Sequence, residues 1–137
     1  MNDYVLLTDS SADLSQQLVE ELGVEVLPLC FTMGDKTYRN WPDNREMDPE
    51  EFYRMLREGG MATTSAVNVG DYTEALTPFL EAGKDVLVLA FSSGLSATCN
   101  SARIAAQELS EQYPQRRVRV VDTLCASLGQ GLLVWHA

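Results

Sequence analysis

Three short stretches of this sequence gather hydroxyl side chains, two of them at the ends of segments that read as strands and the third in a segment that reads as a loop after a helix. Residues 8–11 read TDSS, residues 63–65 read TTS, and residues 92–96 read SSGLS. A helix N-terminus offers unpaired backbone N–H groups and a positive dipole end, so hydroxyls placed beside it bind an oxyanion without a cation. Gly94 allows the backbone to approach such a ligand closely. The stretches predict an oxyanion site, although each also fits a simple helix cap.

Catalysis by these hydroxyls lacks the partners it needs. A serine nucleophile requires an activating base and a group that orients the base. The one histidine is His136, two residues from the end of the sequence, and FSSGLS does not match the G-x-S-x-G elbow of hydrolases. Asp9 is a candidate acid, base or metal ligand, but no second carboxylate lies at a sequence spacing that would indicate a catalytic or metal-binding pair. We therefore expect no catalytic residue, no metal and no cofactor.

Composition narrows the class of partner. The formal net charge of −10 disfavours nucleic acid and anionic membranes. The three cysteines, Cys30, Cys99 and Cys125, are far apart and form no disulfide or zinc pattern, which favours a reducing cytoplasm. The N-terminus lacks the basic region of a signal peptide, and no apolar run is long enough to span a membrane. A cytoplasmic protein is expected.

Apolar runs alternate with helical patterns along the chain. Strands are expected at 4–8, 24–33, 36–39, 85–91 and 118–122, with a hairpin turn at 33–36. Helices are expected after Asp13 or Ser15 as far as Gly23, after Asp48, from Asn68 to about 82, from about 96 to 113, and from about 126. Phe52, Met55 and Leu56 are the expected buried stripe of the second helix. Residues 61–67 are expected to form a loop.

The all-apolar strand at 85–91 indicates the fold class. Such a strand is normally covered on both faces, as in a parallel sheet flanked by helices. The alternation of strands and helices therefore predicts a single α/β domain over residues 1–137, with a mostly parallel sheet and helices on both faces. Ligands in such sheets sit at the carboxyl ends of the strands, where two of the three hydroxyl stretches are expected.

Several motifs, in this order, resemble the DegV family. They are VLLTDSSADLS, MDPEEFYRML, ATTSAVNVGDY, LAFSSGLSATCNSA and VVDTLCASLGQGLLV, and together they span the chain. The family includes the fatty-acid-binding subunits of bacterial fatty acid kinase. The resemblance implies that the protein is not an enzyme. It further implies that the protein binds a long-chain fatty acid such as palmitate through the carboxylate and presents it to a separate kinase, which forms the acyl phosphate.

The resemblance also implies a set of ligand-binding residues. The T-T-S motif of the family matches Thr64, with Thr63 beside it, and the S-S-G-x-S motif matches Ser93 and Ser96 around Gly94. The D-S-x-x-D-L motif matches Asp9, Ser10, Asp13 and Leu14 and shapes the adjacent wall. The sequence departs from the family where Ala66-Val67 replaces the usual Gln-Pro.

Family members are about twice as long, and their second domain supplies a histidine to the carboxylate and much of the acyl tunnel. The sequence ends on the apolar run LLVWHA. We therefore expect this chain to be the first of two domains, with an exposed apolar surface through which it forms a homodimer.

From the residues alone, two other functions stay open. One is a binding module for a small phosphorylated metabolite, and the other is a small α/β hydrolase.

Overall fold

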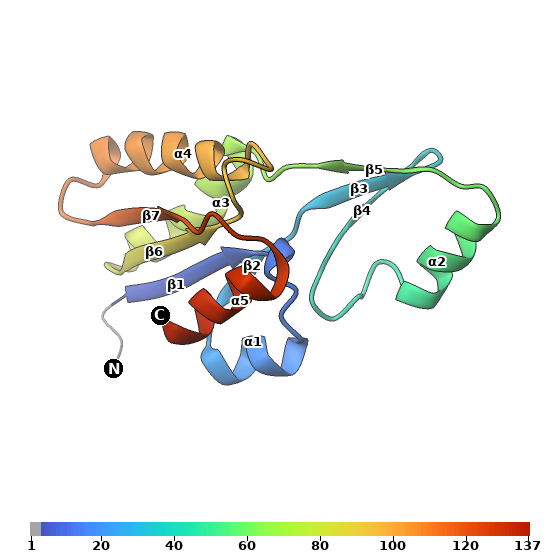
Figure 1. Ribbon diagram of the computed structural model, residues 1–137. Helices are drawn as coiled ribbons and strands as arrows, with labels where there is room; N and C mark the ends of the chain where they lie inside the picture. Colours follow the sequence, from blue (N-terminus) through green and yellow to red (C-terminus); the bar gives the residue numbers. More distant parts are fainter. Residues whose placement is uncertain (1–3) are drawn as a thin grey trace.

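The computed structural model describes residues 4–137 and contains a four-stranded parallel sheet. Its order is β2-β1-β6-β7, with β1 at Tyr4–Asp9, β2 at Glu25–Leu27, β6 at Asp85–Ala90 and β7 at Val118–Asp122. All three pairings are parallel, so the carboxyl ends of the strands meet at one edge. Figure 1 shows this edge at the centre of the molecule.

Helices cover both faces of this sheet (Figure 1). Because side chains alternate along a strand, Leu7 and Val88 face one way and pack with α3 (Val69–Glu81) and α4 (Thr98–Gln112). Leu87 and Leu89 face the other way and pack with α1 (Gln16–Leu22) and α5 (Ser127–His136). The predicted fold class is confirmed.

A second, antiparallel sheet extends from the first and was not predicted. Its order is β4-β3-β5, with β3 at Cys30–Met33, β4 at Lys36–Arg39 and β5 at Ala62–Ser65. The predicted hairpin between β3 and β4 is correct, and Gly34 provides the positive φ of +62° that the two-residue turn needs. Figure 1 shows this sheet, with α2 (Pro49–Arg57), projecting to one side of the main sheet.

Two of the sequence expectations were wrong in this region. The stretch 24–33 is two strands in different sheets, separated by Pro28 and Leu29, because proline has no N–H to continue a ladder. The segment 61–67 is not a loop throughout, since Ala62–Ser65 forms β5 and pairs with β3. Thr63, Thr64 and Ser65 are polar and exposed, because β5 is an edge strand of a small sheet, so the sequence shows no apolar pattern of a strand there.

The predicted apolar stripe of α2 is less buried than expected. Phe52, Met55 and Leu56 are half-buried, and no residue of α2 is fully buried. The helix lies away from the main core, and Phe52 makes an edge-to-face contact with Phe31 of β3 at 5.3 Å. A small sheet shields one side of such a helix only in part.

Helix caps agree closely with the sequence signals. Ser15, Asp48 and Asn68 are N-caps, and Asn68 forms a reciprocal capping box with Asp71. The fourth helix begins at Thr98, two residues later than expected, because the preceding turn folds on itself. Within residues 4–137, no helix combines the length and the hydrophobicity needed to cross a membrane.

Candidate functional site

The ends of β1 and β6 bring two of the hydroxyl stretches side by side. These strands are neighbours, with Thr8 in register with Leu89, so residues 9–11 and 91–93 leave the sheet at the same edge. The backbone N–H of Phe91 donates to Asp9 Oδ2 at 2.8 Å and joins the two turns directly. The expected meeting of these two stretches at the carboxyl edge is therefore observed.

The segment that follows the third stretch reaches the same edge through Thr98. The backbone N–H of Val67, three residues after Thr64, donates to Thr98 Oγ1 at 3.3 Å. Ser96 Oγ lies 2.9 Å from the same Thr98 oxygen. Residues 64–67 thus run from β5 to the start of α4, beside the SSGLS turn.

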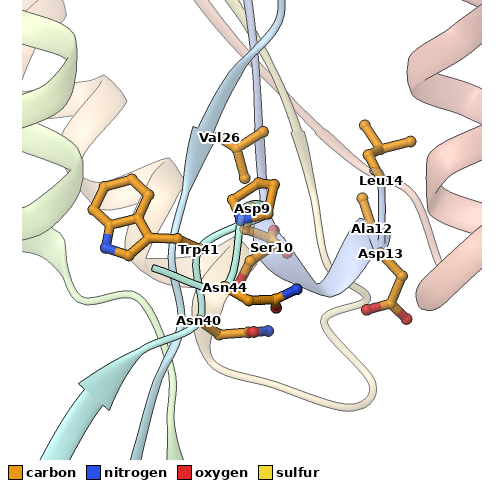
Figure 2. A pocket seen from close by; sticks show the side chains of 10 residues that line it. Asp9, Ser10, Ala12, Asp13, Leu14, Val26, Asn40, Trp41 and Asn44 are labelled. Carbon is orange, nitrogen blue, oxygen red and sulfur yellow. The ribbon is translucent and has the colours of Figure 1, made fainter. Parts of the chain in front are cut away.

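A groove opens beside this edge. One end is a hollow of about 170 Å³ that contains the carboxyl end of β1, and Figure 2 shows Asp9 and Ser10 at its centre with Trp41 on one side. Asp13, Asn40 and Asn44 line this hollow and also the next one, of about 350 Å³, so the two hollows adjoin and together form the groove.

The other end of the groove is mainly apolar. Its wall combines the small sheet with α2 and the segment before it, and it includes Phe31, Met47, Phe52, Tyr53 and Ala62. Thr64 is the hydroxyl residue of β5 that lines this end, because it is in register with Phe31 and shares its face of the sheet. The groove therefore changes from polar to aromatic along its length.

Thr63 points away from this wall. It pairs with Thr32, whose hydroxyl is 2.9 Å from that of Thr37 on the same opposite face. Since adjacent side chains in a strand lie on opposite faces, the structure brings Thr64 to the groove and not Thr63.

The backbone amides of the SSGLS turn are not free donors, contrary to the sequence-based expectation. Ser92 accepts three of them, from Gly94 through its hydroxyl and from Leu95 and Ser96 through its carbonyl. Ser96 Oγ accepts the N–H of Thr98 at 3.2 Å. The turn leaves hydroxyl groups, rather than its own N–H groups, for an anion.

Ser93 lies beside a carboxylate. Its backbone N–H donates to Asp122 Oδ1 at 3.1 Å, and the N–H of Leu124 donates to the same oxygen at 3.1 Å. Hydrogen bonds from the Ser93 side chain and backbone lower the pKa of Asp122 below its ordinary value, and Arg103, 3.9 Å from Oδ2, acts in the same direction. Asp122 therefore competes with any anion for Ser93.

Asp9 and Ser10 are largely enclosed. Asp9 is 0% exposed and Ser10 is 7% exposed. Ser10 Oγ accepts the N–H of Leu29 at 2.9 Å and keeps its own proton to donate. Both oxygens of Asp9 already accept hydrogen bonds within the protein.

His136 lies at the opposite edge of the sheet. The carbonyl of the next residue, Ala137, accepts a hydrogen bond from Tyr4 at the start of β1, 3.0 Å away. The hydroxyl turns lie at the other end of that six-residue strand, about 17 Å farther along at the usual rise per residue. Within residues 4–137, no cluster of three His, Cys, Asp or Glu side chains is placed to hold a metal ion.

Sequence reasoning missed several groove residues. Asn40, Trp41 and Asn44 lie between the predicted strand at 36–39 and the predicted helix after Asp48, and Phe31 was one residue of a predicted strand with no assigned face. The available signal was the predicted hairpin. The second strand of a hairpin runs antiparallel to the first, so the residues that follow it return to the place where the first strand began.

Comparison with known proteins places this arrangement in a family. The family model described as "Uncharacterised protein, DegV family" matches residues 4–137. This chain belongs to the DegV family.

Among curated relatives, a DegV domain-containing protein of Clostridium perfringens is 44% identical over 137 residues, which is all of this chain and 47% of that protein. The chain thus spans about half the length of the curated relatives it matches.

Solved structures show the same fold. A DegV family protein from Thermus thermophilus, described by its fatty acid binding, has a TM-score of 0.84 and 40% identity over 97% of this chain and 45% of its own. A stearic-acid-binding protein from Eubacterium ventriosum has a TM-score of 0.85 and 29% identity over 96% of this chain and 45% of its own.

Proposed function

We propose that this chain binds a long-chain fatty acid and holds its carboxylate at the carboxyl edge of the main sheet. The observation that carries the proposal is the pair of adjoining hollows, with polar groups at the strand end and aromatic side chains farther along. A fatty acid has the same division into an anionic head and an apolar tail. The fatty acids named for the relatives from T. thermophilus and E. ventriosum support this assignment.

In the proposed complex, hydroxyl groups hold the head group. Thr64, Ser93 and Ser96 are its donors as the family resemblance implies. Of these three, Thr64 lines the groove, whereas Ser93 and Ser96 lie in the turn beside it, and Ser10 adds a hydroxyl from the polar hollow. Hydrogen bonds to a charged group are worth about 1.5–3 kcal/mol each. Gly94 leaves space for the carboxylate beside Ser93.

The charges around the groove favour a carboxylate over a phosphate. Among the residues that line its two hollows, Asp9 and Asp13 are acidic and none is basic. A phosphate monoester carries nearly two negative charges at neutral pH, so neutral hydroxyls beside two carboxylates would hold it poorly. This observation disfavours the phosphorylated-metabolite alternative.

We propose that the bound fatty acid is presented to a separate kinase, and that this chain is not itself an enzyme. Thr64 and Ser93 are both exposed, so a head group held by them is accessible to a second protein. His136 lies at the far edge of the sheet, which supports the absence of a serine nucleophile. A kinase partner implies a cytoplasmic location.

The rest of the tail needs a cover that this groove does not provide. Tyr53 of the apolar wall is 58% exposed, and each buried methylene contributes about 0.8 kcal/mol. Because the relatives extend well beyond the matched part, we propose that a second unit covers the tail in the complete site.

Extraction of the purified chain followed by mass spectrometry tests the proposal. We expect a 16- or 18-carbon fatty acid, enriched over a Thr64→Ala/Ser93→Ala double variant purified in parallel. A phosphorylated metabolite would instead support the alternative binding function. Equal fatty acid content in the two proteins would contradict binding at this site.

A further inference from the structure

A buried polar cluster lies directly beneath the carboxyl edge. Thr8, Asp9 and Gln130 are each 0% exposed, although none is apolar. Gln130, in α5, donates from Nε2 to Thr8 Oγ1 at 3.0 Å and to Asp9 Oδ1 at 3.2 Å. Its Oε1 accepts a hydrogen bond from Ser11 Oγ at 2.9 Å. The amide of Gln130 thus uses both its donor and its acceptor side within the cluster.

The carboxylate of Asp9 joins three separate segments of the chain. Its Oδ2 accepts the N–H of Phe91 at the end of β6, 2.8 Å away. Its Oδ1 accepts the N–H of Ser11 at 3.1 Å and also lies beside the Ser11 hydroxyl, whose single proton is shared between Asp9 and Gln130 Oε1. With the bond from Gln130, the turn after β1, the exit of β6 and α5 all depend on this one side chain.

These contacts leave Asp9 poorly suited to touch a ligand. A buried carboxylate is tolerated only when its oxygens are hydrogen-bonded, and here they are. A second carboxylate brought against it would be repelled. Phe91, in contrast, immediately precedes the SSGLS turn, so the bond to its N–H sets where Ser92 and Ser93 begin.

We propose that Asp9 and Gln130 are positioning residues: they fix the SSGLS turn relative to the turn after β1 and do not contact the ligand. The proposal rests on the proposed function for the ligand, a fatty acid carboxylate. It also makes α5 part of the site, because Gln130 is the side chain through which that helix joins the cluster.

An exchange of the two polar groups tests this role. In Asp9→Asn, either orientation of the new amide turns its NH₂ toward an existing donor, Phe91 N–H or the Gln130 amide. In the double variant Asp9→Asn/Gln130→Glu, the amide now at position 9 donates to the carboxylate now at position 130. The net charge is unchanged. Gln107→Glu, on the exposed face of α4, adds the same charge as Gln130→Glu and serves as the control.

Palmitate titration and ¹H–¹⁵N spectra are the two measurements. We expect Asp9→Asn to weaken binding at least tenfold and to shift the amide resonances of residues 91–96. The double variant should recover most of the affinity and the wild-type positions of those resonances. Gln107→Glu should change neither.

Three outcomes would overturn the proposal. One is wild-type affinity in Asp9→Asn. Another is a double variant whose spectrum is restored but whose affinity is not, since Asp9 would then contact the ligand itself. If Asp9→Asn does not fold, Ser11→Ala removes the hydroxyl that Asp9 and Gln130 share, and unmoved resonances at 91–96 in that variant would be the third.

The spectra also separate this proposal from the proposed function. If the wild-type chain binds no palmitate, the fatty acid assignment fails. The restored resonances of the double variant still show whether the cluster positions the turn.

Discussion

At the scale of single residues, the two neighbouring threonines of β5 should differ in their effect on binding. Thr64→Ala removes a hydroxyl that faces the groove, and the loss of a donor to a carboxylate costs about 1.5–3 kcal/mol. We expect its palmitate affinity to fall by tenfold or more in a calorimetric titration. Thr63→Ala is the matched control, because its side chain lies on the other face, and it should bind like the wild type. A larger loss in Thr63→Ala than in Thr64→Ala would contradict the assigned faces.

Asp122 should oppose binding of an anion. Asp122→Asn keeps an oxygen that accepts the backbone N–H groups of Ser93 and Leu124. It removes one negative charge, and the side-chain hydroxyl of Ser93 becomes available to the ligand. We expect a severalfold rise in palmitate affinity. Asp35→Asn at the hairpin tip removes the same charge far from the turn and should have no effect. Weaker binding in Asp122→Asn would show that this carboxylate supports the site.

The same side chain predicts a pH dependence of stability. The pKa of Asp122 is lowered in the folded protein from its ordinary value of 3.8. Its ionised form therefore stabilises the fold above that pH, and the contribution disappears as the pH falls through the lowered pKa. We expect Asp122→Asn to be less stable than the wild type in urea at pH 7 and to match it near pH 2. A gap that persists at pH 2 would contradict this prediction.

At the scale of elements, the docking of α5 depends on one glycine. A Cβ at Gly131 would lie 2.9 Å from the carbonyl oxygen of Ala12 and 3.1 Å from Leu14. Gly131→Ala should therefore displace the helix and lower the unfolding free energy by about 1–3 kcal/mol.

Gly129→Ala, in the same helix, is the control. Its Cβ would make an ordinary 3.4 Å contact with Cys125, and alanine favours a helix over glycine by about 0.5–1 kcal/mol. It should match or exceed wild-type stability in urea denaturation. Equal losses in the two variants would show that α5 tolerates no side chain in either position.

The sequence predicted the main sheet well because its signals are local. The apolar run at 85–91 and the caps Asp48 and Asn68 depend on neighbouring residues, and each marks the correct element. The second sheet could not be predicted in the same way, because β5 exists only through its pairing with β3, some thirty residues earlier.

The candidate site was predictable only in part for the same reason. Parallel strands place their carboxyl ends together, so the meeting of the turns at Asp9 and Ser92 followed from the fold class. The aromatic half of the groove depends on how the small sheet and α2 pack, which no local pattern records. The hydrogen bonds that occupy the N–H groups of the SSGLS turn could likewise not be predicted, because they depend on the folded conformation of the turn.

At the scale of the whole molecule, α5 carries an exposed apolar stripe. Leu128 is 72% exposed, Leu132 58% and Trp135 57%, and Leu124, in the turn before the helix, is 75% exposed. Such a patch favours association, so we expect concentration-dependent dimers in analytical ultracentrifugation. Leu128→Glu/Leu132→Glu should be monomeric, and Gln107→Glu should not. A monomeric wild type at high concentration would contradict this expectation.

The central claim is that the groove binds a fatty acid through its carboxylate. The most direct test is a calorimetric titration of the chain with palmitate and, separately, with methyl palmitate, which has the same tail without the charge. If the hydroxyl edge holds the head group, palmitate should bind at least tenfold more tightly, a difference of about 1.4 kcal/mol. Equal affinity for the two compounds, or no binding of palmitate, would contradict the claim.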